Sequence, residues 1–153
     1  MELVRDGLRF DRERVIAACV RHKRDIVAAD EFDRGQRNLL ILGHTFGHAV
    51  ELLSDFTLSH GRAVAIGTAI AGRASVSLGL CDQGTATRIM WLLERFGLPV
   101  FTPHSAQALC EAALSDKKRA GDTVNLILPK KIGECAISPT PVSALENLIQ
   151  AGL

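Results

Sequence analysis

The stretch RNLLILGHTFGH (residues 37–48) decides how the rest of the chain is interpreted, because it places two histidines behind a run of leucine and isoleucine. His44 and His48 are four residues apart, which is one turn of an α-helix. The pattern predicts a helix over about residues 36–53. Apolar residues cover most of its circumference, which is typical of a helix inside a domain.

On such a helix Arg37, Ile41, His44 and His48 would share one face, and this leaves two interpretations of the histidines open. Imidazoles at i and i+4 can bind one metal ion, but a catalytic zinc ion normally takes three protein ligands and water. His60 lies beyond a turn-rich loop that can bring it back to this helix. The alternative is a pair of hydrogen-bonded core histidines, and spacing alone favours that alternative.

Basic residues near the histidines are equally ambiguous. Lys23 lies one turn from Cys19 and Val27, so we expect it to point along the buried stripe of a helix that begins after Asp11. Lys23 and Arg37 are either ordinary ion-pair partners or contacts to a phosphate or carboxylate. The pair at 117–118 is typical of a solvated turn.

The remaining pattern predicts a mainly α fold with one small β-hairpin, in a single domain of 153 residues. VNLILP and ECAIS read as two short strands around the turn KKIG. The other helices are expected from Asp11 to Ala29, over 62–79, from Asp82 or Thr85 to Gly97, over 106–114, and from Pro141 onward.

Composition excludes several classes of protein. A net charge of +1 gives no reason to expect nucleic acid or an anionic membrane as the main partner. The longest apolar run is too short to span a bilayer, and the N-terminus lacks the apolar core of a secretory signal. Four scattered cysteines without zinc-finger spacing indicate a reducing, cytoplasmic setting.

Several ordered motifs resemble the 3-dehydroquinate synthase family. HKRDIVAADEFDRGQRNLLILGHTFGHAVE (residues 22–51) is similar to the family pattern K-x-x-V-V-x-x-D-E…R-x-x-L-N-x-G-H-T-x-G-H-A-x-E. SHGRAVAIG, RFGLP, SDKK and LILPKKIG follow in the family's order. The resemblance covers nearly the whole chain, from about Arg12 onward.

The resemblance implies that residues 1–153 are the mainly helical, metal- and substrate-binding C-terminal domain of such an enzyme. His44 and His60 match two ligands of a zinc (or cobalt) ion. The family's third ligand is a glutamate in an E-x-x-K segment that has no match in this chain. Positions matching catalytic residues are Lys23, Arg37 and His48, and those matching substrate contacts are Lys23, Arg37, Leu40, His48, Lys117 and Lys118.

The family converts 3-deoxy-D-arabino-heptulosonate 7-phosphate to 3-dehydroquinate and phosphate, in the shikimate pathway. NAD, bound mainly by an N-terminal domain, transiently oxidises a ring hydroxyl before phosphate is eliminated. The resemblance therefore implies a small sugar phosphate as substrate, an NAD-binding N-terminal half that is absent here, and a homodimer. The isolated chain is expected to be inactive.

Two positions depart from the family pattern. Ile41 stands in place of an asparagine, which replaces a hydrogen-bonding amide by hydrocarbon. Arg62 stands in place of a glutamate directly after His60 and Gly61, and a positive charge there would weaken the binding of a dication. These departures keep two alternatives open: another sugar-phosphate cyclase of secondary metabolism, or a non-catalytic remnant of the fold.

Overall fold

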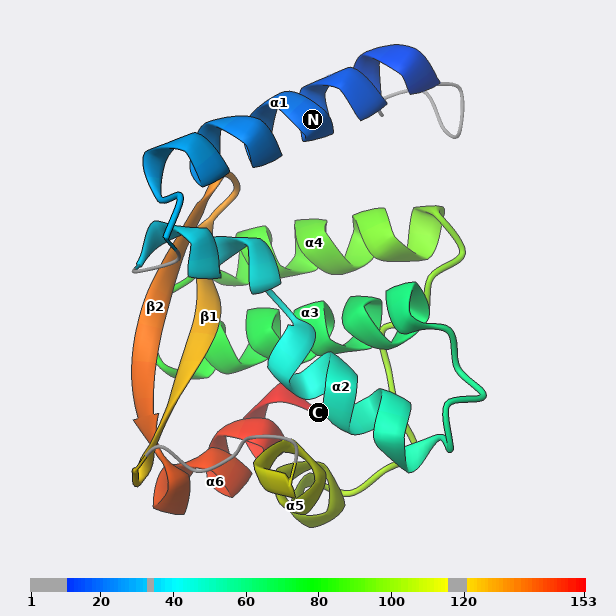
Figure 1. The fold of residues 1–153 in the computed structure, drawn as a ribbon. Coiled ribbons are helices and arrows are strands. Elements are labelled where there is room, and N and C mark those ends of the chain that lie inside the picture. The colour runs from blue at the N-terminus through cyan, green and yellow to red at the C-terminus, as the bar shows by residue number, and fades with distance from the viewer. Residues whose placement is uncertain (1–10, 33–34, 116–120) are drawn as a thin grey trace. The chain divides into compact units, whose positions relative to one another are not determined.

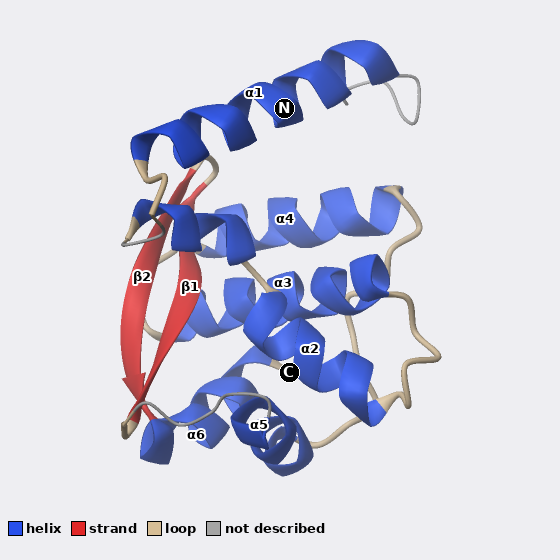
Figure 2. Cartoon of the chain, in the orientation of Figure 1, coloured by secondary structure: helices blue, strands red, loops and turns tan. Residues whose placement is uncertain are grey.

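The computed structural model of the protein describes residues 11–32, 35–115 and 121–153. The chain divides into two compact units, residues 1–40 and residues 41–153. Helices dominate both units, and the sheet of the described residues has two antiparallel strands (Figure 2). This confirms the mainly α fold with one hairpin. No helix in the described ranges is long and apolar enough to cross a membrane.

The first unit contains helix α1 (Arg12–Ala29) and most of the 3-10 helix η2 (Gln36–Ile41), whose last residue begins the second unit. Asp11 caps α1 as expected, because its Oδ1 accepts a hydrogen bond of 3.0 Å from the N–H of Arg14. No residue of α1 is buried, and Lys23 is exposed, so the prediction that Lys23 follows a buried stripe is wrong. Periodicity identifies an apolar stripe but does not supply the element that would cover it.

The prediction of one continuous helix over residues 36–53 is also wrong. A 3-10 helix ends at Ile41, and an α-helix, α2 (His44–Leu53), begins only after Gly43. Gly43 has φ +79°, a left-handed conformation that interrupts the helical path. A Cβ atom on Gly43 would lie 2.7 Å from Thr68 N and 2.8 Å from Val64 O, so only glycine fits there. His44 and His48 therefore share a face of α2, whereas Arg37 and Ile41 precede the break.

Helix α3 (His60–Ser77) lies at the centre of the second unit and contacts α2, α4, α6 and β1 (Figure 1). Its own Ile70 belongs to the core together with Phe46, Leu109 and Ile149 of other helices, and all four are fully or almost fully buried. The remaining elements are α4 (Gln83–Arg95), α5 (Ala106–Ser115), β1 (Thr123–Lys131), β2 (Glu134–Pro141) and α6 (Val142–Gly152).

The start of α4 and the C-terminal ends of α3 and α4 lie where the sequence predicted them. Asp82 caps α4 by accepting a hydrogen bond of 2.8 Å from the N–H of Thr85. Gly79 and Gly97 follow α3 and α4 with φ of +68° and +66°, the left-handed conformation that closes a helix. Local capping chemistry therefore sets these boundaries.

Helices α2 and α3 cross at glycine, which brings their backbones into direct contact. A Cβ atom on Gly67 would lie 2.5 Å from Gly47 N and 3.0 Å from Gly47 Cα, and closer still to the carbonyl oxygen of Gly43. Ordinary contacts between such atoms are about 3.5 Å or longer. The crossing therefore requires the absence of a side chain at Gly67, and it fixes where the residues of α2 lie relative to the start of α3.

The hairpin forms as expected around a tight turn in which Gly133 has φ +87°. Several residues of β1 are buried, so this strand contributes directly to the core: Val124, Leu126, Ile127 and Leu128 are among them. Buried Ser75 of α3 donates a hydrogen bond from its hydroxyl group to the carbonyl of Pro129. This bond ties the central helix to the end of β1.

Candidate metal and substrate site

Helix α2 presents three groups with metal-binding or acid–base chemistry along one face. His44 is its first residue, and His48 and Glu51 follow at steps of four and three, which is the spacing of neighbours on a helical face. All three are half-buried, while Phe46 and Val50 on the opposite side enter the core. The helix thus holds its polar groups at the surface of a rigid, packed element.

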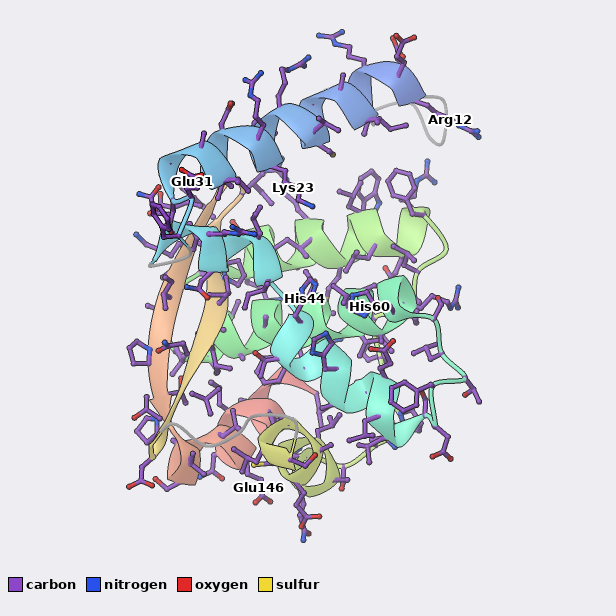
Figure 3. All side chains as sticks on the ribbon, viewed as in Figure 1. Arg12, Lys23, Glu31, His44, His60 and Glu146 are labelled. Carbon is purple, nitrogen blue, oxygen red and sulfur yellow. The ribbon has the colours of Figure 1, made fainter. Side chains whose placement is uncertain are left out.

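His60 completes a cluster of three imidazoles. It is the first residue of α3, and Figure 3 shows its side chain and that of His44 lying close together between the two helices. The ring centroids are 5.6 Å apart for His44 and His48, 5.4 Å for His44 and His60, and 5.5 Å for His48 and His60. The structure therefore brings together the three histidines that the sequence singled out.

The spacing of the rings suits a shared metal ion. With a Zn–N bond of about 2.1 Å, two imidazoles at a tetrahedral angle have ring centroids roughly 5 Å apart. The observed separations are within about half an ångström of that value. Imidazole nitrogens are also a donor type that zinc and cobalt accept readily. These donor types fit a divalent transition-metal ion, and the ligand atoms that all lie within 4.8 Å of one another are those of His48, Glu51 and His60.

His44 and His60 each have an acceptor next to Nδ1. The Nδ1 atom of His44 lies 3.3 Å from the carbonyl oxygen of Leu42, and that of His60 lies 3.2 Å from Oε2 of Glu51. One potential ligand atom from each of His48, Glu51 and His60 falls within 4.8 Å of the others. Glu51 is a site residue to which the sequence reasoning gave no role.

The connection between α2 and α3 is a tight loop that returns the chain to the face of α2. Asp55 and Phe56 both have positive φ, 50° and 57°, although neither is glycine. The N–H of Phe56 donates to the carbonyl of Glu51 at 3.0 Å, and the Thr57 hydroxyl donates to that of Ser54 at 2.6 Å. Backbone strain at these two residues accompanies the return of the chain to α2.

A surface hollow of about 390 Å³ adjoins the cluster. Its lining combines an imidazole, a carboxylate and an exposed aromatic ring, and consists of His48, Glu51, Leu52, Phe56 and Ser115. The hollow is open on one side and mixes polar with apolar groups. It is therefore suited to a small polar molecule more than to a hydrocarbon.

The predicted anion contacts belong to other parts of the chain. Lys23, Arg37 and Leu40 lie in the unit of residues 1–40, whereas the histidines lie in the second unit, so a common site stays a prediction. Arg37 is half-buried, and its guanidinium donates to the carbonyl of Glu31 at 3.2 Å. The predicted Lys117 and Lys118 lie outside the described residues.

The structure shows where the two residues that depart from the family pattern lie. Ile41 ends η2 before the break at Gly43 and is 41% exposed, so it is not on the α2 face that carries the histidines. The guanidinium of Arg62 donates to the carbonyl of Gly97 at 3.3 Å, beyond the C-terminal end of α4. There its charge interacts favourably with the end of a helix.

The cysteines are free thiols and give no sign of metal binding. Cys19 is exposed, whereas Cys81 and Cys110 are buried and Cys135 is half-buried. Burial raises the pKa of Cys81, Cys110 and Cys135, and neighbouring carboxylates raise it further. These three thiols therefore stay protonated at neutral pH and are poor nucleophiles.

Solved structures with the same fold define the structural class. A 2-deoxy-scyllo-inosose synthase complexed with carbaglucose-6-phosphate, NAD⁺ and Co²⁺ matches 92% of this chain and 41% of its own, with a TM-score of 0.78 at 23% identity. The 2-epi-5-epi-valiolone synthase ValA of Streptomyces hygroscopicus subsp. jinggangensis 5008, with NAD⁺ and Zn²⁺ bound, matches 91% of this chain and 38% of its own, with a TM-score of 0.78 at 22% identity. The chain thus has the fold of one part of these two synthases.

Sequence similarity then identifies the family. The 3-dehydroquinate synthase C-terminal family matches residues 4–119. The 3-dehydroquinate synthase of Pelobacter propionicus is 42% identical over 127 residues, and that of Dehalococcoides mccartyi strain BAV1 is 43% identical over 142 residues. The chain belongs to the 3-dehydroquinate synthase family, as its motifs predicted. The matches cover 82% and 89% of this chain but only 35% and 40% of these relatives.

Proposed function

We propose that the chain is the metal- and substrate-binding part of a 3-dehydroquinate synthase, a lyase that converts 3-deoxy-D-arabino-heptulosonate 7-phosphate to 3-dehydroquinate and phosphate. The cluster of His44, His48 and His60 carries this proposal, because it brings three histidines of the family motifs within about 5.6 Å of one another, centroid to centroid. Relatives that are 42% and 43% identical share the name of this activity.

His44 and His60 would hold a zinc or cobalt ion, completed by a ligand from a part of the enzyme that this chain does not match. The bound ion would act as a Lewis acid on substrate hydroxyl and carbonyl oxygens. The solved structures with this fold contain Co²⁺ or Zn²⁺ together with NAD⁺, which supports the same pair of cofactors here. NAD would be bound mainly by the remainder of the enzyme, and the protein would orient substrate and cofactor.

The role of His48 is to hold and move a proton at the substrate. It lies on the same face of α2 as His44, and it lines the open hollow of about 390 Å³ that a small sugar phosphate can enter. Imidazole is the side chain best suited to proton transfer near neutral pH. The separation of roles between His48 and the two proposed ligands rests on the family motif, since the three rings are almost equally spaced and the ligand atoms within 4.8 Å of one another are those of His48, Glu51 and His60.

The cations predicted from the motifs would bind the charged groups of the substrate. Lys23, Arg37 and the lysines at 117 and 118 would contact its carboxylate and phosphate, with Leu40 as an apolar contact. Charge of this kind stabilises a leaving phosphate only if the cations are held in place before reaction. A homodimeric, cytoplasmic enzyme completes the proposal.

A hybrid enzyme tests the proposed reaction. We would join the full chain to the N-terminal portion of the Dehalococcoides relative that it does not match, and measure phosphate release with NAD and zinc. We expect turnover of heptulosonate phosphate, and a loss of about 10³-fold or more in the His44→Ala and His60→Ala hybrids, because each removes a ligand. No turnover in a folded hybrid that binds zinc would contradict the proposal.

The same hybrid distinguishes the alternatives. The solved structures with this fold belong to synthases of other cyclitols, so another sugar-phosphate cyclase is the second candidate function. That candidate predicts turnover of a different sugar phosphate and none of heptulosonate phosphate. A non-catalytic remnant predicts no turnover of any of them and no stoichiometric metal binding.

A further inference from the structure

Glu51 forms a direct link between α2 and α3 at the metal cluster. Its Oε2 atom lies 3.2 Å from Nδ1 of His60, although the two residues are on different helices. The Glu51 side chain is 19% exposed and that of His60 is 52% exposed. The contact thus joins a half-buried carboxylate to an imidazole that faces solvent.

The chemistry of this contact determines which nitrogen of His60 remains available. An ionised carboxylate can only accept hydrogen bonds, so Nδ1 of His60 must carry the hydrogen and Nε2 keeps its lone pair. The carbonyl of Leu42 has the same effect on His44, whose Nδ1 lies 3.3 Å from it. Both proposed ligands therefore offer Nε2 in the unprotonated form that a metal ion needs.

We propose that Glu51 is a positioning residue that fixes the tautomer and the ring orientation of His60, and that it does not itself bind the metal ion. The inference rests on the proposed metal site. The competing role is direct ligation, since Glu51 offers a ligand atom within 4.8 Å of those of His48 and His60. The two roles differ in whether an uncharged acceptor oxygen can replace the carboxylate.

The first test needs no metal. Nitrogen NMR of the metal-free full chain at a pH of about 8.5, where imidazole is neutral, reports which nitrogen of His60 carries hydrogen. We expect the Nδ1–H tautomer in the wild type and in Glu51→Gln, and a change to the Nε2–H tautomer in Glu51→Ala. An Nε2–H tautomer in the wild type would overturn the proposal, whatever reaction the assembled enzyme catalyses.

The second test uses Co²⁺ as the probe, followed by its visible absorption in the hybrid enzyme. We expect Glu51→Ala to weaken Co²⁺ binding by about 10- to 100-fold, the usual effect of losing a partner of a ligating histidine. Glu51→Gln should keep most of the affinity and a similar spectrum, because its amide oxygen still accepts from Nδ1. Glu146→Gln on α6 makes the same charge change far from the labelled histidines (Figure 3) and should have no effect.

Each outcome of this titration has a definite meaning. Equal losses of affinity in Glu51→Gln and Glu51→Ala would show that the charge itself is required, as expected of a ligand, and would overturn the proposal. Unchanged Co²⁺ affinity in Glu51→Ala would overturn it as well. Melting curves of the metal-free variants separate these results from loss of folding. Failure of catalysis with a normal tautomer and normal Co²⁺ binding would count against the proposed function alone.

Discussion

Replacing Gly67 by alanine should open the crossing of α2 and α3. The new Cβ atom would lie 2.5 Å from Gly47 N, 3.0 Å from Gly47 Cα, and closer to the carbonyl oxygen of Gly43. Restoring ordinary contact, at about 3.5 Å, requires the two helices to move apart by roughly 1 Å. Because all of these neighbours are backbone atoms, no change of side-chain rotamer can relieve the overlap.

The size of the effect follows from two opposing terms. Overpacking of a tight contact costs up to about 3 kcal/mol, while alanine is favoured over glycine in a helix by about 1 kcal/mol. We therefore expect Gly67→Ala to lower the free energy of unfolding by about 2 kcal/mol. In a chain of this length that corresponds to a fall in Tm of roughly 4–8 °C.

Gly72 provides a matched control on the same helix. A Cβ atom there would meet the Cβ of Ala86 at 3.9 Å, which is ordinary contact. Gly72→Ala should thus gain about 0.5–1 kcal/mol from helix propensity alone. Thermal and urea unfolding, followed by circular dichroism and by the fluorescence of the single tryptophan, Trp91, measure both variants. A Gly67→Ala variant as stable as Gly72→Ala would refute the reasoning.

Two other substitutions test the fold. Ser75→Ala leaves the buried carbonyl of Pro129 without its hydroxyl donor and should cost about 1–3 kcal/mol in urea unfolding, whereas Ser77→Ala, whose hydroxyl bonds within α3, should change stability by less than about 0.5 kcal/mol. The hydroxyl of Thr85, and to a lesser extent its N–H, donates hydrogen bonds that lower the pKa of Asp82 in the folded protein. The ionised carboxylate therefore stabilises the fold at pH values above the unfolded pKa of about 3.9. This contribution is lost as the pH falls through the lower pKa of the folded state. Asp82→Asn should therefore lose less stability than the wild type between about pH 6 and about pH 2, as measured by urea midpoints; equal losses would contradict this assignment.

Much of the fold was predictable because local chemistry sets most of its boundaries. Asp11 and Asp82 cap helices where the sequence indicated, and Gly79 and Gly97 end them. The break at Gly43 was not predictable, since glycine is also tolerated inside helices. Its left-handed conformation is dictated by the close approach of α3, which is a tertiary contact.

The candidate site, too, was predictable in one part and not in another. The spacing of His44 and His48 and the loop before His60 left both a metal cluster and a pair of core histidines open, and the structure brings the three rings together. Glu51 was missed because its partner is nine residues away across a loop of unusual conformation. Its position three residues after His48 was the available signal, since that spacing places the carboxylate on the face of the histidines.

The cluster is held from both ends of the α2–α3 pair. At one end, the glycine crossing fixes α2 against the middle of α3. At the other, Asp55 and Phe56 adopt left-handed conformations that cost a non-glycine residue about 1–2 kcal/mol each, and the chain then returns to place His60 against Glu51. Strain of this kind persists only where surrounding structure over-determines it. Because the crossing and the loop both constrain His60 relative to α2, the backbone sets the relative positions of the three histidines, and the contact with Glu51 then orients the ring of His60.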